Sequence, residues 1–302
     1  IKSQNNILVS SDMLVEGVHF DMSFTPLKHL GYKSVIVNIS DIYAMNAIPT
    51  HITVNLGISS KYTLEAIDEL YDGILLACKK YKVDIIGGDI TSCLNGLTIS
   101  ITVIGEGNEN EIVRRSGAKE NDLLVTTGDL GGAYMGLNVL QREKEVWKNN
   151  QNMQPELDNF NYILERQLKP EARKDIIESF KDNSIKPTSM IDISDGLASE
   201  IFHICKSSNV GCQVYEDKIP IDSETYKTSM DFNLNPTISA LNGGEDYELL
   251  FTINQKDYEK IKNDPKITVI GHITKKDQGI NLVGKGNTLT PLNAQGWNHF
   301  NS

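Results

Sequence analysis

The hydrophobic residues recur along the chain with two periods, which predict a mixture of strands and helices. Short apolar runs are typical of buried strands, and the alternation of Ile99, Ile101 and Val103 with Ser and Thr predicts a half-exposed one. Strands are therefore expected at Ile7–Ser11, His51–Ile58, Asp84–Ile86, 99–103, Leu123–Thr127, Met190–Ile193, Leu249–Ile253 and Ile267–Ile273.

Helical spacing is clearest over Thr63–Tyr81, where apolar residues form one stripe. Leu27–Ala47 is predicted as a buried helix, since its apolar residues keep the same spacing without an internal proline. Ser194 and Asp195 are good helix-start residues. Further helices are expected from Gly132 to Leu140, over Glu171–Lys181, over Leu197–Ser207 and over Tyr258–Asn263, with the polar Gln141–Asp158 as a surface excursion.

Strands and helices mix without a regular βαβ rhythm, which favours an α+β (α/β) fold class. A length of 302 residues lies at the upper edge of what one core serves. A boundary within Ser116–Asn121 predicts two domains, residues 1–118 and 119–302.

The charge balance excludes some classes of partner. The chain has 29 Lys and Arg against 40 Asp and Glu, a net charge of −11, whereas nucleic acids and anionic membranes require a basic patch. No uncharged apolar run is long enough to cross a membrane. The four cysteines show no CxxC spacing, so reduced thiols in a cytoplasmic protein are expected. Arginine, the usual bidentate phosphate ligand, occurs only at Arg114, Arg115, Arg142, Arg166 and Arg173.

Acidic residues interrupt apolar stretches at five places. A helix cap or a turn explains each one taken alone. Asp41 is the sharpest case, because an ionised carboxylate between Ile39 and Ile42 is costly unless it is paired or binds a metal. The five places are Ser10-Ser11-Asp12, Asp41, Gly87-Gly88-Asp89, Asp192–Gly196 and Gly243–Asp246.

Converging carboxylates would require a cation. Two of them about 4 Å apart repel by about 4 kcal/mol at an effective dielectric constant near 20. Oxygen ligands without His or Cys favour Mg²⁺, which usually completes its coordination with substrate phosphates. The pattern therefore favours nucleotide phosphate chemistry. The chain contains no Walker A sequence and no kinase HRD or DFG signature, which excludes both common kinase scaffolds.

The two halves of the chain show a faint internal similarity. NISDI at 38–42 and DISDG at 192–196 each precede a Gly-Gly-acidic motif. Asp41 and Asp89 are 48 positions apart, and Asp195 and Glu245 are 50 apart. Chance and an ancient duplication both remain open as explanations.

Seven segments along the chain form a recognisable series. They are Ser10–Phe20, Asn38–Ala47, Gly87–Thr91, Arg115–Ala118, Asp192–Leu197, Gly243–Leu250 and Gly296–Phe300. In this order they resemble the signature of the thiamine-monophosphate kinase family. The resemblance spans nearly the whole chain and implies a two-domain PurM-like fold of the aminoimidazole-ribonucleotide-synthetase superfamily, dimerising through the N-terminal domain. It also implies Mg²⁺-assisted, direct in-line transfer of a phosphoryl group from ATP to thiamine monophosphate, giving thiamine diphosphate.

The same resemblance implies a role for each matching residue. Catalysis would involve Asp41, Asp89, Asp195 and Arg115. Substrate contacts are implied at His19, Glu245 and Trp297, and ATP contacts at Tyr71, Gly88, Asp89, Arg115 and Ser194, with Tyr81 and Arg114 as alternatives to Tyr71 and Arg115. Mg²⁺ ligands are implied at Ser10, Ser11, Asp12, Asp41, Asp89, Asp192 and Asp195. The family's GDDAA-type segment, a further source of a ligand, would precede Ile1.

Two other interpretations stay open. The chain would also fit a sister enzyme of the superfamily, such as a selenophosphate synthetase, a hydrogenase-maturation enzyme or a purine-pathway ligase. It would equally fit a non-catalytic protein that binds Mg²⁺ and nucleotide without turnover. The set of His19, Glu245 and Trp297 favours the kinase.

Overall fold

The computed structural model describes residues 5–293 and divides into two compact units. Unit 1 comprises the described residues up to Ile112, together with Leu140–Glu156 and Leu168–Lys174. Unit 2 comprises Val113–Val139, Leu157–Gln167 and the described residues from Asp175 onward. Because two later segments pack into unit 1, a single cut such as the expected one between residues 118 and 119 does not reproduce these units.

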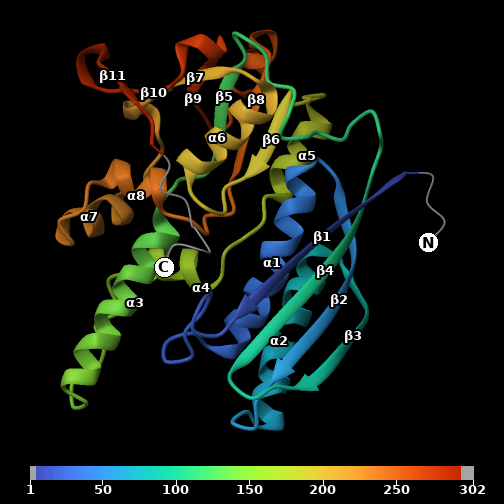
Figure 1. Ribbon diagram of the computed structural model, residues 1–302, viewed down its shortest axis with the longest axis vertical. Coiled ribbons are helices and arrows are strands. Elements are labelled where there is room, and N and C mark those ends of the chain that lie inside the picture. Colours follow the sequence, from blue (N-terminus) through green and yellow to red (C-terminus); the bar gives the residue numbers. More distant parts are fainter. Residues whose placement is uncertain (1–4, 294–302) are drawn as a thin grey trace. The chain divides into compact units, whose positions relative to one another are not determined.

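Unit 1 contains a four-stranded sheet with the strand order β1-β4-β2-β3. β2 pairs in parallel with β3, and the other pairs are antiparallel. Two helices, α1 and α2, pack side by side against the sheet (Figure 1). The elements are β1 (Asn6–Val15), α1 (Leu27–Ala44), β2 (Ile48–Ile58), α2 (Leu64–Tyr81), β3 (Asp84–Ser92) and β4 (Leu97–Gly107).

Two glycines let these helices approach closely. A Cβ atom on Gly31 of α1 would lie 2.0 Å from the carbonyl oxygen of Leu70, and one on Gly73 of α2 would lie 1.9 Å from that of Lys28. Both distances are far shorter than any real Cβ contact, so the backbones themselves touch at this crossing. Helix α1 is consequently buried without interruption from Leu30 to Ser40.

Alternation along β1 decides which side chains face the helices. Leu8 and Leu14 are buried, whereas Val9 and Met13 are 64% and 56% exposed. Successive side chains of a strand point to opposite faces of the sheet. Even-numbered residues of β1 therefore face the helix side, and odd-numbered residues face the open side.

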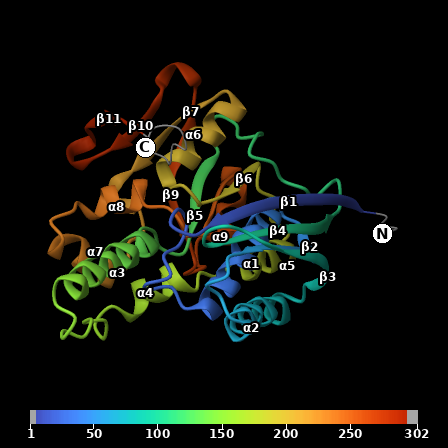
Figure 2. The same ribbon diagram turned by 60° about the horizontal axis from the view of Figure 1, so that its bottom comes forward.

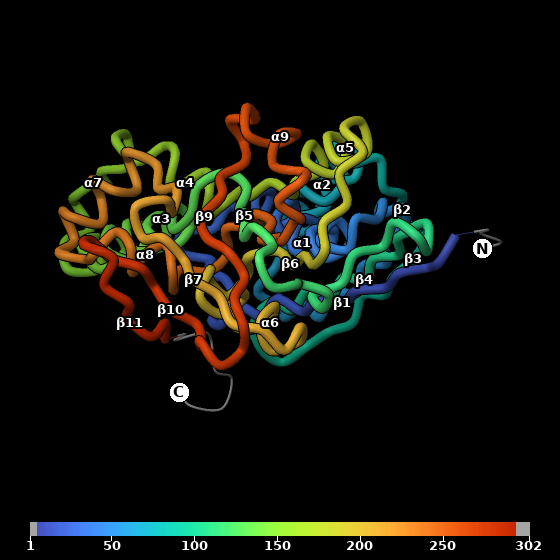
Figure 3. Tube along the Cα trace, turned by 90° about the horizontal axis from the view of Figure 1, so that it is seen from above, coloured from blue at the N-terminus to red at the C-terminus, as the bar shows by residue number. Residues whose placement is uncertain are grey.

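Unit 2 contains a seven-stranded sheet with the strand order β11-β10-β7-β9-β5-β8-β6. Among the residues that the structure describes, β7 and β10 form the one parallel pair of this sheet. Figure 2 shows the same elements from another side, and Figure 3 shows α7 beside α8. The strands are β5 (Leu123–Thr127), β6 (Ser189–Asp192), β7 (Gly211–Tyr215), β8 (Leu249–Ile253), β9 (Ile267–Thr274), β10 (Ile280–Val283) and β11 (Leu289–Pro291).

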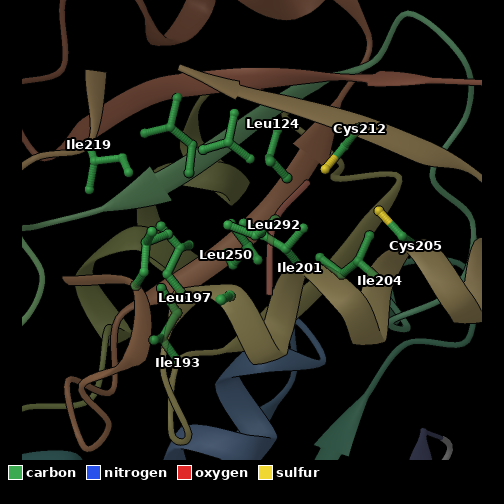
Figure 4. Packing of buried hydrophobic residues seen from close by; sticks show 14 of the residues in the cluster. Leu124, Ile193, Leu197, Ile201, Ile204, Cys205, Cys212, Ile219, Leu250 and Leu292 are labelled. Carbon is green, nitrogen blue, oxygen red and sulfur yellow. The ribbon is translucent and has the colours of Figure 1, made fainter. Parts of the chain in front are cut away.

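Two helices of this part of the chain, α6 and α8, contribute residues to an apolar core that also includes strand residues. Residues of α6 such as Leu197 and Ile201 pack with Leu124 of β5 and Leu250 of β8 (Figure 4). The four cysteines are free thiols, and Cys205 and Cys212 lie in this core. The helices are α3 (Gly132–Asn149), α4 (Asn161–Leu168), α5 (Lys174–Asp182), α6 (Leu197–Ser208), α7 (Ser223–Asp231), α8 (Pro236–Asn242) and α9 (Tyr258–Ile261).

The expected α+β class is confirmed, with several differences in the helices. α3 continues to Asn149 through residues expected as a surface excursion, because Arg, Glu and Lys are good helix formers and a helix on the surface needs few apolar residues. α4, α7 and α8 were not expected, since seven to nine residues are too few to reveal a period. α1 ends three residues before the expected end and α5 begins three residues after the expected start. Within the described residues, no helix is both long and apolar enough to cross a membrane.

Candidate functional site

Three of the residues expected to bind Mg²⁺ come together in unit 1. Ser10 and Asp12 lie on the helix-facing side of β1, and Asp41 lies on α1. The hydroxyl of Ser10 donates a hydrogen bond to Oδ2 of Asp41. The backbone N–H of Asp12 donates to Oδ1 of Asn38, one turn before Asp41, at 2.9 Å. Asn38 thereby holds the edge strand β1 against α1.

This arrangement leaves Asp12 in an unfavourable environment for a charge. Burial, with the nearby charge of Asp41 as a second cause, raises the pKa of Asp12 to about 6. Within the described part of the chain, Asp12 forms no ion pair. A cation bound beside the two carboxylates would relieve both effects.

Ser11 and Asp89 lie elsewhere in unit 1. The hydroxyl of Ser11 faces the open side of the sheet, where it bonds with Thr102 Oγ1 at 2.9 Å. Asp89 is exposed on β3, at the opposite edge of the sheet from β1. Three strand spacings separate these edges, about 14 Å. Within one chain, Asp89 therefore does not join Asp12 and Asp41 around one ion.

The remaining expected residues of unit 1 are placed as follows. His19 follows β1 in a tight turn, and its Nδ1 accepts the backbone N–H of Val15 at 3.0 Å. Tyr71 is half-buried on α2, and burial raises its pKa. Gly88 is packed so closely against β2 that a Cβ atom would lie 1.8 Å from the carbonyl oxygen of Val54. Trp297 lies outside the described residues.

In unit 2, the structure brings two expected motifs side by side. The loop at 243–248 continues the antiparallel pairing of β8 with β6. The backbone N–H of Glu245 donates to the carbonyl of Ser194 at 2.7 Å, and that of Tyr247 donates to the carbonyl of Ile193 at 2.9 Å. A Cβ atom on Gly244 would lie 2.4 Å from the Ser194 carbonyl oxygen, so this contact requires glycine.

Arg115 lies near the same loops. The carbonyl of its neighbour Arg114 accepts the N–H of Met190 on β6 at 3.0 Å, and Arg115 itself interacts electrostatically with Glu200. Oε1 of Glu200 accepts the backbone N–H of Asp195 at 3.1 Å. Burial raises the pKa of Glu200 to about 7, although the backbone bond from Asp195 opposes the rise. The side chain of Glu200 thus accepts a backbone N–H just before α6. The helix start itself has no side-chain cap from Ser194 or Asp195.

A buried arginine holds the second half of the 243–248 loop. Nη1 of Arg166, on α4, donates to Oε1 of Glu248 at 2.9 Å, and its Nη2 lies 3.5 Å from Oδ1 of Asp246. Burial lowers the pKa of Arg166, but the charges of Glu248 and Asp246 outweigh it and the pKa is raised. Burial raises the pKa of Asp246 to about 7, against the opposing effects of Arg166 and two backbone N–H groups.

The donor chemistry of both units fits Mg²⁺ better than a transition metal. Asp12, Asp41, Asp192 and Asp195 supply only oxygen. Within residues 5–293, no three His, Cys, Asp or Glu side chains are grouped as one metal ion would require. One or two carboxylates with substrate phosphates and water is, however, a usual set for Mg²⁺.

Sequence reasoning missed several residues that organise these sites. Asn38 lies in the motif at 38–42, and its position one helical turn before Asp41 was a signal that could have singled it out. Arg166 was one of only five arginines, a signal that could have singled it out. Glu200 and Gln167 gave no signal, because a polar residue on a helix reads as solvent-exposed until its neighbours are known.

Comparison with known proteins identifies the family. The model for the N-terminal domain of AIR synthase related proteins matches residues 1–106, and the model for their C-terminal domain matches residues 119–282. A thiamine-monophosphate kinase of Bacillus subtilis is 35% identical over 97% of this chain and 88% of its own length. One from Buchnera aphidicola (Schizaphis graminum) is 40% identical over 98% of this chain and 88% of its own length.

Solved structures agree with these sequence matches. AaThiL complexed with AMPPCP and TMP is 28% identical, with a TM-score of 0.84 over 99% of this chain and 89% of that one. Hydrogenase maturation protein HypE in complex with ATP has a TM-score of 0.76 over 97% of this chain and 86% of that one, but at 15% identity it shares only the fold. The chain therefore belongs to the thiamine-monophosphate kinase family, within the AIR synthase related proteins.

Proposed function

We propose that this chain catalyses the transfer of a phosphoryl group from ATP to thiamine monophosphate, giving thiamine diphosphate. The likeness to AaThiL complexed with AMPPCP and TMP carries this proposal, because it covers 99% of the chain and therefore both units. The reaction also suits the carboxylates described above. They are costly to keep together without a cation, and phosphoryl transfer from ATP normally brings one.

Residues of each unit would bind Mg²⁺, ATP or thiamine monophosphate. Asp12 and Asp41, with Ser10 holding the carboxylate of Asp41, would bind Mg²⁺, as would Asp192 and Asp195; Ser11 and Asp89 stay in the proposed set. When bound, Mg²⁺ neutralises negative charge on the phosphoryl oxygens. Arg115, Tyr71, Gly88 and Ser194 would contact ATP. His19, Glu245 and Trp297 would contact thiamine monophosphate.

The acceptor chemistry explains why no strong general base is needed. The nucleophile is a phosphate oxygen of thiamine monophosphate, which is already ionised near neutral pH. Catalysis then consists of positioning two anions and stabilising the charge that develops between them. Direct in-line transfer without a phosphoenzyme is part of the proposal because the resemblance to the family implies it.

We further infer a homodimer formed through the open face of the unit 1 sheet, in a cytoplasmic enzyme. Val9 and Met13, whose side chains lie on the open face of β1, are each more than half exposed, and exposed apolar residues on one face are typical of interaction surfaces. Analytical ultracentrifugation should give twice the chain mass at micromolar concentration. A single species at 33.6 kDa would contradict the dimer.

The decisive experiment measures ADP release with three acceptors. Activity is expected with thiamine monophosphate, and only background with thiamine or without acceptor. Chelation of Mg²⁺ by EDTA should abolish activity, and an excess of Mg²⁺ should restore it. Equal ADP release without acceptor would favour another enzyme of the superfamily. ATP binding without turnover under every condition would favour a non-catalytic protein.

A further inference from the structure

We propose that Gln167 of α4 is a positioning residue that fixes the carboxylate of Glu245 for the substrate. The inference rests on the proposed function, in which Glu245 contacts thiamine monophosphate. Gln167 is 6% exposed, and its Nε2 donates to Oε2 of Glu245 at 2.9 Å. A buried amide committed to one oxygen of a carboxylate restricts the rotation of that carboxylate.

The backbone at Glu245 makes such a restraint necessary. Glu245 has a φ of 66° and Tyr247 a φ of 51°, in the left-handed region that non-glycine residues adopt only under constraint. The backbone conformations of Glu245 and Tyr247 are therefore both unfavourable on their own. Contacts from outside the loop must hold them.

The end of α4 supplies those contacts with two adjacent residues. Arg166 binds Glu248 at 2.9 Å and the carbonyl of Asp246 at 3.3 Å, while Gln167 binds Glu245. Helix α4 is itself fixed against α3, because a Cβ atom on Gly136 would lie 2.1 Å from the carbonyl oxygen of Ile163. The charged side chain anchors the loop, and the neutral one orients the group that meets the substrate.

The difference in chemistry between the two residues separates their roles. Arg166 neutralises buried charge, so its loss affects folding. Gln167 carries no charge, so it orients the carboxylate of Glu245 without placing a positive charge beside it. A carboxylate held in place there suits a cationic ligand such as the thiazolium-bearing substrate.

The test compares Gln167→Met, which keeps the side-chain length but removes the donor, with Glu165→Gln on the exposed side of the same helix. We expect Gln167→Met to raise the KM for thiamine monophosphate about tenfold, as loss of a hydrogen bond to a charged group would. The kcat and the KM for ATP should change less than about twofold. Glu165→Gln should behave as the wild type.

A double-mutant cycle shows whether Gln167 acts through Glu245. In a Glu245→Gln background, Gln167→Met should change the KM for thiamine monophosphate no further. The exchanged pair Gln167→Glu with Glu245→Gln keeps a donor opposite an acceptor but moves the charge. The exchanged pair should have the melting temperature of the wild type but a raised KM for thiamine monophosphate. It also replaces Gln167→Met in the test if that variant folds poorly.

Three results would count against the proposal in distinguishable ways. An unchanged KM in Gln167→Met, with a raised KM in Glu245→Gln, would overturn the positioning role and leave the proposed function intact. Equal changes in both KM values, together with a lower melting temperature, would reduce Gln167 to a packing residue. A wild-type protein without turnover of thiamine monophosphate would overturn the proposed function and this inference with it.

Discussion

The two acidic regions of this protein begin from similar sequences and are stabilised in opposite ways. In unit 1, NISD lies within α1, where Asp41 bonds with Ser10 of β1, and GGD lies on β3 at the opposite edge of the sheet from β1. In unit 2, DISD precedes α6, and its Ser194 carbonyl binds the backbone of Glu245. The spacing of 48 and 50 residues is nearly equal, yet only the second pair of motifs meets.

The difference extends to the charges. The buried carboxylates of Asp246 and Glu248 have Arg166 between them, so unit 2 carries its own counter-charge. Asp12 in unit 1 instead has the like charge of Asp41 beside it. A buried carboxylate with its own counter-charge is stabilised by it, whereas a carboxylate such as Asp12, which has no ion pair among the described residues, is a candidate for binding a cation.

The largest expected effect comes from removing the internal counter-charge. Arg166→Met should lower the free energy of unfolding by about 3–5 kcal/mol, because the buried carboxylates of Glu248 and Asp246 would lose the guanidinium group that binds both of them. Urea denaturation followed by circular dichroism measures this. Lys148→Met, which breaks an exposed pair with Glu145 on α3, is the control and should cost about 0.5 kcal/mol or less. Similar losses in both variants would contradict the role given to Arg166.

The next effect separates activity from stability in unit 1. Asp41→Asn keeps an acceptor for Ser10 but removes one negative charge beside Asp12. ADP formation should fall at least about a hundredfold, as for other losses of transition-state charge stabilisation. Without ligands, the free energy of unfolding should stay level or rise by about 1 kcal/mol, since a repulsion is removed. An active Asp41→Asn enzyme would refute the assignment of Asp41.

A smaller effect is the pH dependence that Asp246 contributes. Burial raises the pKa of Asp246 from 3.8 to about 7 in the folded protein. The folded state therefore binds a proton that the unfolded state releases. This contribution to stability is complete below about pH 3.8 and is lost as the pH rises through about 7, by at most about 1.4 kcal/mol per pH unit.

Asp246→Asn tests this sign directly, because asparagine keeps the size and cannot titrate. The wild type should lose stability between pH 5 and pH 8, and the variant should lose less. Urea denaturation at both pH values checks the prediction. A steeper loss in the variant would mean that Asp246 is already ionised at pH 5, held so by Arg166 and the N–H groups of Gly131 and Ala133.

The sequence predicted elements better than it predicted neighbours. Strand β5 and helix α6 were located to within a residue, because their hydrophobic patterns are local. The contact of Ser10 with Asp41 depends on the packing of β1 against α1, about thirty residues later, which no local pattern encodes. Asp89 was grouped with Asp41 from its Gly-Gly-Asp motif and from the resemblance to the family, and strand order places it at the opposite edge of the sheet from β1.

Residues that act through others were the hardest to foresee. Gln167 and Arg166 belong to a helix too short to be recognised, and their partners lie about eighty residues away. The resemblance to a family named the residues that would touch ligands, since those lie in motifs. It gave nothing on the residues that hold them, because supporting contacts are spread over the whole unit.

The close crossing of α1 and α2 at Gly31 and Gly73 fixes the direction in which α1 runs over the sheet. Asp41 lies ten residues along α1 from Gly31, about 15 Å of helix. A methyl group added at either glycine would force the helices apart and tilt α1 about the crossing. That tilt would displace the carboxylate of Asp41 relative to Ser10 without touching either residue. These two glycines, about 15 Å along the helix from Asp41, thus help to fix the position of a proposed Mg²⁺ ligand relative to the sheet.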